Sequence, residues 1–183
     1  MRNKNSSIWI DVNIGEVSDV VGGGTPDTKD SSNFTEKGKG IPWITPADLS
    51  GYSKMFISTG ARDLSKKGYE NSSAKILPKG TILFSSRAPI GYVAIAENEI
   101  TTNQGFKSFV LHNGIDSVYA YYFLISIKEI AEEKGTGTTF KEISGTTAKT
   151  LPFRVFPFAE QKEIADRLDN LLAQVESIKL RLK

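Results

Sequence analysis

The chain up to about residue 114 carries patterns typical of β-strands. "WIDVNIGEVSDVV" alternates apolar and polar residues before three glycines, a threonine and a proline, which predicts a strand running into a loop. "GIPWITPADLSG" should be extended, because residues that precede Pro42 and Pro46 avoid the helical region. Residues 77–114 read as β throughout, since "TILFSS", "YVAIA" and "FKSFVL" are rich in β-branched and aromatic residues.

Helical patterns follow or interrupt these strands. "TGARDLSKKGYENS" predicts a short helix that closes near Gly68. "DSVYAYYFLISIKEIAEEKG" predicts a longer helix, capped by Asp116 or Ser117 and ended by Gly135. "TLPFRVFPF" is typical of a short strand or edge segment broken by prolines. This order predicts an α+β domain over residues 1–157, with a compact and mostly antiparallel sheet.

A long helix is predicted for residues 158–183, and its apolar residues form a narrow seam. The seam positions alternate spacings of four and three: Ile164, Leu168, Leu171, Val175, Ile178 and Leu182. This alternation is typical of a coiled coil, whereas a helix packed on its own domain usually shows a wider apolar stripe. Pairing with a second long helix is therefore the favoured interpretation, and docking on the chain's own domain is the alternative.

Positive charge is concentrated in one part of the chain, although the net charge of the 183 residues is only +2. From Ser50 to Ile90, seven basic residues face two acidic ones. The basic residues are Lys54, Arg62, Lys66, Lys67, Lys75, Lys79 and Arg87. Such a region fits a face directed at a polyanion, and it fits a solvated surface almost as well.

Several classes of function lack their usual residues. The chain has no cysteine and one histidine, so a thiolate or histidine-based metal site is not expected. A phosphate-binding loop, a nucleophile elbow and a kinase-type catalytic loop are missing from the sequence. No apolar run approaches a membrane span, and "MRNKNSSIWIDV" lacks the apolar stretch of a signal peptide. We therefore expect a cytoplasmic, non-catalytic protein with no metal, no cofactor and no membrane contact.

Several stretches together resemble one family. "GGGTP", "IPWITPADL", "LPKGTILFSSRAPIGYVAI", "TNQGFKSF" and "LPFRVFPFAEQKEIADRLDNLLAQVESI" are similar to segments of the specificity subunits of type I restriction–modification systems. The resemblance covers nearly the whole chain in the right order. It implies one target-recognition domain followed by one spacer helix, which corresponds to half of such a subunit, either a natural half-subunit or a fragment.

The resemblance also implies a function and partners. Each recognition domain of such a subunit reads one half of a split site in double-stranded DNA, and two antiparallel helices set the gap between the halves. The paired helices dock the DNA methyltransferase (modification) subunits, and the restriction translocase–nuclease subunits then join the assembly. The helix of residues 158–183 would pair with a second recognition half or with another copy of the chain.

Candidate DNA-binding residues are basic, hydroxyl and aromatic side chains in predicted loops. For each of them, a surface or turn role without DNA is the alternative. We expect Lys54, Arg62, Lys66 and Lys67 to contact phosphates or bases, and Tyr52 to stack or hydrogen-bond. The remaining candidates are Ser85 and Arg87 before a proline–glycine turn, Thr25 and Lys29 in "GGGTPDTKD", and Thr138 and Lys141 in "KGTGTTFKEIS".

Two other functions stay open on the sequence. A protein–protein scaffold would use the helix as its interface and leave the basic region as plain surface. An enzyme with an unrecognised site is the weaker third possibility.

Overall fold

A five-stranded sheet lies at the centre of the computed structural model, which describes residues 8–87, 89–138 and 141–181. Its strand order is β2-β10-β7-β8-β5. The strands span Ser18–Gly22 (β2), Lys107–Leu111 (β10), Ile82–Ser86 (β7), Ile90–Ala96 (β8) and Phe56–Ile57 (β5). All neighbours pair antiparallel except β5 and β8, which are parallel. The predicted α+β class and mostly antiparallel sheet are confirmed.

The central strand β7 is buried on both faces. Ile82 and Phe84 face one core cluster, which also contains Phe109 and the apolar residues of the helices. Leu83, between them in sequence, faces a second cluster on the opposite side of the sheet. Because neighbouring side chains of a strand point to opposite faces, a continuous apolar run such as "ILF" is what a doubly covered strand requires.

Helices cover the first of these faces. They are α2 (Ser117–Ser126), α3 (Lys128–Lys134) and α4 (Gly145–Lys149), with the 3₁₀ turn η1 (Ile14–Glu16) beside α4. Asp116 caps α2 as predicted, since its Oδ1 accepts hydrogen bonds from the backbone N–H groups of Val118 and Tyr119. Gly135 follows α3 directly, as expected.

The single helix predicted over this region is wrong in one respect: the structure breaks it at Ile127. The backbone there has φ −103° and ψ 16°, outside the helical range. The hydroxyl of Ser126 donates to the carbonyl of Phe123, and such a local bond competes with the helical ladder. The break lets both Ile127 and Ala131 reach the core, because α3 can turn against β8 independently of α2.

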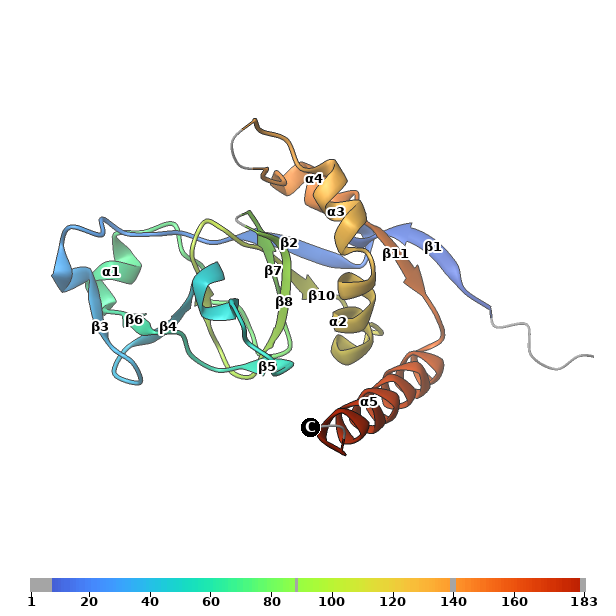
Figure 1. The fold of residues 1–183 in the computed structure, drawn as a ribbon. Coiled ribbons are helices and arrows are strands. Elements are labelled where there is room, and N and C mark those ends of the chain that lie inside the picture. The colour runs from blue at the N-terminus through green and yellow to red at the C-terminus, as the bar shows by residue number, and fades with distance from the viewer. Residues whose placement is uncertain (1–7, 88, 139–140, 182–183) are drawn as a thin grey trace, which may run out of the picture.

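A four-stranded sheet, in the order β3-β6-β4-β9, lies at the end of the molecule away from α2 and α3 (Figure 1). Its strands are Phe34–Glu36 (β3), Arg62–Leu64 (β6), Ile41–Ile44 (β4) and Thr101–Thr102 (β9). The 3₁₀ turns η2 (Ser31–Asn33) and η3 (Pro46–Leu49) and the short helix α1 (Lys66–Glu70) connect them. We call this sheet, its turns and α1 the distal lobe; its small core contains Trp43, Leu64 and Ala74.

The short helix α1 differs from its prediction at its end. Gly68 lies inside the helix, which continues to Glu70, and Ser65 caps its start by accepting from the N–H of Gly68. A Cβ at position 68 would approach the carbonyl oxygen of Asn33 to 1.9 Å. This glycine therefore serves close packing against η2, and not helix termination.

The end of the chain returns to its beginning. Strand β11 (Pro152–Val155) pairs antiparallel with β1 (Ile10–Asn13), and the helix α5 (Phe158–Arg181) follows. Gln161, in the first turns of α5, is fully buried. Its Oε1 accepts from the N–H of Asp116, and its Nε2 donates to the carbonyls of Gly114 and Phe156. One amide side chain thus fixes the start of α5 to the helical face of the domain.

We expect Gln161→Ala to lower the free energy of unfolding by about 2–4 kcal/mol, since it removes the three hydrogen bonds that this fully buried side chain makes to backbone groups. Chemical denaturation would measure this difference. Asp166→Ala, an exposed change on the same helix, serves as the control and should stay within about 0.5 kcal/mol of the wild type. An equal effect of both changes would contradict the anchoring role of Gln161.

Candidate nucleic-acid interface

Most of the basic and aromatic candidates lie in the distal lobe or in the loop of residues 50–55, which leads from η3 into β5 of the five-stranded sheet, and they differ in exposure and in their partners. Lys54 is exposed just before β5, and no ion pair to it is found among the described residues. Lys66 is also exposed, and only a long contact of 3.9 Å joins its Nζ to Glu70 on the next turn. Tyr52 is partly exposed, and its hydroxyl donates to the carbonyl of Phe56 at 2.6 Å. These side chains have surface to offer a ligand.

Lys67, in contrast, is engaged in an ion pair and a hydrogen bond at η2. Its Nζ lies 2.8 Å from Oδ2 of Asp30 and 2.7 Å from Oγ of Ser32. The hydrogen bond from Lys67, followed by those from Ser32, lowers the pKa of Asp30 to about 2. The pair joins α1 to η2, and the ammonium group already has an anionic partner.

Arg62 lies over two aromatic rings. Its guanidinium carbon is 3.5 Å from the centroid of Phe34 and 5.5 Å from that of Trp43. A hollow of about 270 Å³ opens beside it, lined by Trp43, Thr45, Asp48, Ala61 and Arg62. The guanidinium is therefore held in place while the residue remains exposed.

The stretches "GGGTP" (residues 22–26) and "TNQG" (residues 102–105) meet at the junction of the distal lobe and the five-stranded sheet. The hydroxyl of Thr25 donates to Oε1 of Gln104, which is exposed. Asn103 Oδ1 accepts from the N–H of Gly105, so this amide stabilises its own turn. Lys29 is exposed in the loop that follows Thr25. The structure thus places Thr25 beside Gln104.

The candidates from the "SSRAPIG" stretch have internal partners. Ser85 is fully buried; its hydroxyl donates to the carbonyl of Pro89 and accepts from the N–H of Tyr92. This hydroxyl has no surface with which to contact a ligand, so we leave Ser85 out of the interface. Arg87 is half-buried, and its Nη1 lies 3.6 Å from Glu142, which also pairs with Lys107.

The loop after α3 is bound to the end of β7 through the same glutamate. Glu142 forms isolated β-bridges with Arg87 and Thr136. Thr138 is exposed, and Lys141 donates weakly, at 3.4 Å, to the carbonyl of Glu132. Both belong to the loop between α3 and α4, which lies apart from α1 of the distal lobe, the helix that carries Lys66 (Figure 1).

The seam of α5 divides into two parts. Ile164 packs against the main core, and Leu168 lines a cavity of about 310 Å³ together with residues of α2 and β11. Leu171, Val175 and Ile178 are 56%, 45% and 56% exposed. Leu182 lies outside the described residues. Docking on the domain thus accounts for the first part of the seam, while the second part has no partner within the described chain.

Two contacts of α5 were missed on the sequence. The hydroxyl of Tyr122 on α2 donates to the carboxylate of Asp169, and burial together with this bond raises the pKa of Tyr122. The second missed contact is that of Gln161. The sequence pattern did mark this residue, because Gln161 lies three residues before Ile164 and so continues the alternation of the seam. A polar residue at a seam position is a sign of a specific buried partner.

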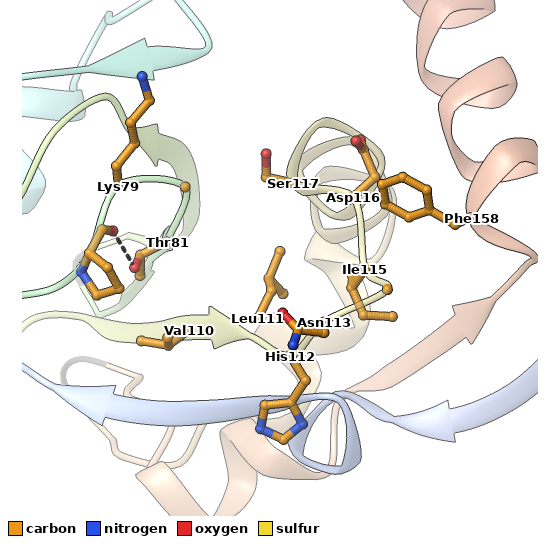
Figure 2. A pocket seen from close by; sticks show the side chains of 13 residues that line it. Lys79, Thr81, Val110, Leu111, His112, Asn113, Ile115, Asp116, Ser117 and Phe158 are labelled. Atoms are coloured by element: carbon orange, nitrogen blue, oxygen red, sulfur yellow. Dashed lines mark hydrogen bonds between the residues drawn. The ribbon is translucent and has the colours of Figure 1, made fainter.

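A polar cleft of about 390 Å³ lies where β10 ends and α2 begins. Figure 2 shows Lys79 on one side of it and Asp116 with Phe158 on the other. Asp116 is already engaged as the cap of α2, and Nε2 of His112, which also lines the cleft, lies 3.6 Å from Oδ1 of Asp19. Within residues 8–87, 89–138 and 141–181, no group of three acidic or histidine side chains could hold a metal ion. In that part of the chain, no helix is both long and apolar enough to cross a membrane.

Comparisons with known proteins point to one family. A family model described as "Type I restriction modification DNA specificity domain" matches residues 7–183. The type I restriction enzyme MjaIX specificity subunit of Methanocaldococcus jannaschii is 42% identical over 159 residues, which cover 86% of this chain and 36% of that protein. The chain thus spans about a third of the length of this relative.

Solved structures show the same fold. The crystal structure of the HsdS subunit from Thermoanaerobacter tengcongensis matches with a TM-score of 0.74 at 22% identity, over 94% of this chain and 39% of that one. A chain solved for the complex assembly and conformational transition of the type I R-M system matches with a TM-score of 0.78, also at 22% identity, over 98% of this chain and 43% of that one.

We expect an NMR titration of the Asp30 carboxylate to give a pKa of about 2, and Lys67→Ala to raise it toward the ordinary value of 3.8. Because the pKa in the folded state lies below that of the unfolded chain, the stabilisation is present above about pH 3.8 and is lost as the pH falls through about 2. Lys66→Ala is the matched control and should leave the titration of Asp30 unchanged. A titration midpoint near pH 3.8 in the wild type would show that the ion pair between Lys67 and Asp30 does not form.

Proposed function

Because the chain belongs to the type I restriction modification DNA specificity domain family, we propose that it recognises one half of a split target sequence in double-stranded DNA. The match of the family model to residues 7–183 carries this proposal. Residues 1–157 would form the recognition domain, and residues 158–183 the spacer helix. The role is non-catalytic, and we assign it to the cytoplasm, where the proposed DNA target is found.

The exposed residues of the distal lobe and of the loop of residues 50–55 support this function. Lys54, Lys66 and Lys29 are long, flexible cations that can follow phosphates and set the register of the protein on the duplex. Arg62, held on its aromatic rings, and Tyr52 can approach base edges in the major groove, where each base pair presents a distinct pattern of donors and acceptors. The lobe projects from the body of the molecule, away from α5, so DNA and helix partners could bind at the same time (Figure 1).

The second part of α5 supports a helical partner. Its apolar positions Leu171, Val175 and Ile178 continue a coiled-coil spacing beyond the domain. We propose that they pair with the equivalent helix of a second recognition half or of another copy of the chain. The paired helices would then dock the DNA methyltransferase subunits, to which the restriction translocase–nuclease subunits are added.

A protein–protein scaffold is the second candidate, because the exposed stripe of α5 by itself requires only a helical partner. In that case the distal lobe would have no ligand. The two functions differ in one measurable property, which is sequence preference on DNA.

The test of the function uses a complex reconstituted from this chain, as the only specificity component, and the methyltransferase subunits of its own system. We expect methylated adenines at one short motif when the complex acts on duplex DNA of random sequence. If two copies pair through α5, the motif should occur twice in inverted orientation. Methyltransferase subunits without the chain are the control.

Methylation with no sequence preference by an assembled complex would leave α5 as an interface and remove the DNA-reading role. An assembled complex that methylates nothing would have the same meaning. A motif that appears equally without the chain would show that another component carries the specificity.

We expect the double variant Leu171→Glu and Val175→Glu to weaken self-association of the chain at least about tenfold, because each buried apolar side chain contributes about 1.5–3 kcal/mol. Sedimentation equilibrium would measure the change in the dissociation constant. Asn170→Glu, an exposed polar position on the same turn, is the matched control and should associate like the wild type. A wild-type chain that stays monomeric at all concentrations would rule out the pairing of two copies and leave a second recognition half as the partner.

A further inference from the structure

Among the described residues of the globular domain, Arg62 differs from Arg87 and Arg154 in having no anionic partner. Arg87 pairs with Glu142, and Arg154 pairs with Asp11 through two of its nitrogens. For Arg62, the contacts found among the described residues are the rings of Phe34 and Trp43.

This absence is not due to a lack of nearby carboxylates. Asp48 accepts from the N–H and hydroxyl of Thr45 and from the N–H of Ala61, and it lines the same hollow as Arg62. Asp63, next in sequence, accepts from the N–H groups of Gly38 and Gly40. Both carboxylates accept hydrogen bonds from other groups, and among the described residues neither forms an ion pair with Arg62.

The third carboxylate lies directly across the sheet. Glu36 is the register partner of Arg62 on β3, yet its carboxylate lies 2.6 Å from the ammonium group of Lys39. Asp48, Asp63 and Glu36 thus each have a donor other than the guanidinium of Arg62.

The side chain is also rigidly based. Its strand, β6, is paired on both sides, to Glu36 on β3 and to Trp43 on β4. The Trp43 ring is itself fixed, since its Nε1 donates to the carbonyl of Gly24 at 3.0 Å. Phe34 packs against Trp43 with ring centroids 5.5 Å apart. The arginine therefore rests on a platform whose own orientation is determined.

We propose that Arg62 reads a guanine in the major groove, with its guanidinium donating two hydrogen bonds to O6 and N7 of the base. The proposal rests on the function proposed above and specifies one residue of it. A separation of 3.5 Å from the ring centroid is the distance of stacked groups, and stacking leaves the N–H edge free while it restricts the rotamers of the side chain. A fixed fork suits the two acceptors of guanine, which form the commonest specific contact of arginine with DNA.

A phosphate is the less suitable ligand for this residue. Phosphate contacts tolerate flexible side chains, and Lys66 in the same lobe and Lys54 in the loop before β5 provide such charges. Holding an arginine on two rings adds little to a contact that a mobile lysine makes equally well, but it orients a bidentate donor.

The experiment compares three variants in the reconstituted complex, with duplex DNA of random sequence as the probe and the bound DNA sequenced. Arg62→Lys keeps the charge and loses the planar fork. Arg62→Met removes the charge and still covers Phe34 with a long, unbranched side chain. Lys54→Met is the control, which removes one exposed charge from the loop that leads from η3 into β5. Thermal unfolding of each variant reports whether the lobe stays folded.

We expect the wild type to select a motif with at least one fixed G·C pair. At one such position, both Arg62 variants should lose about 5- to 150-fold of the preference for guanine, with the other positions unchanged. Lys54→Met should weaken binding equally for all sequences and reduce the salt slope by about one unit.

Four outcomes would overturn the proposal. If Arg62→Lys keeps the wild-type motif, the residue binds a phosphate or only covers the ring. If both variants weaken binding uniformly and lower the salt slope, the ligand is a phosphate. If the wild-type motif has no fixed G·C pair, Arg62 does not read a guanine, although the recognition function stands. If the wild type selects no motif, both the guanine contact and the recognition function are ruled out. Should Arg62→Met fail to fold, Arg62→Lys alone decides.

Discussion

The double burial of β7 is the constraint on which the rest of the structure depends. A strand whose every residue from Ile82 to Ser86 is buried needs apolar layers on both of its faces. The helices α2 and α3 supply one layer, and residues that lead to the distal lobe supply the other. The molecule therefore has a fixed order of helical face, central sheet and distal lobe. This order separates the helix-bearing end of the molecule from the end with exposed charge.

The elements that depend on local patterns could be predicted from the sequence. Alternating or continuous β-branched residues indicated β7, β8 and β10, and the alternation of fours and threes indicated α5. The break at Ile127 and the continuation of α1 past Gly68 could not, because the break brings Ile127 and Ala131 onto the core and Gly68 packs against Asn33, which is distant in sequence. Tertiary contacts decide such details against local propensity.

The candidate site was harder to predict for a related reason, which is that its charges are neutralised by residues far away in sequence. The surplus of basic residues between Ser50 and Ile90 does not predict that Asp30 forms an ion pair with Lys67, or that Glu142 forms one with Arg87. The reverse holds for Arg62, since Asp48, Asp63 and Glu36 all have other partners. Which charges lack a partner is decided by the folded surface. A count of basic residues along the chain therefore includes Lys67 and Arg87, which have acidic partners, and does not single out Arg62, which is held on two rings.

The anchoring of α5 by Gln161 gives the molecule the mechanics of a lever. From Gln161 to Arg181 the helix is about 30 Å long, at roughly 1.5 Å per residue. A tilt of about 10° at the anchored end would move the free end by about 5 Å, more than the ~3.4 Å between neighbouring base pairs of one strand. In a paired arrangement of two such helices, a few buried hydrogen bonds at each pivot would thus set the span between two recognition lobes to within a base-pair step. Side chains that never touch DNA would in this way help to determine which spacing of half-sites the assembly accepts.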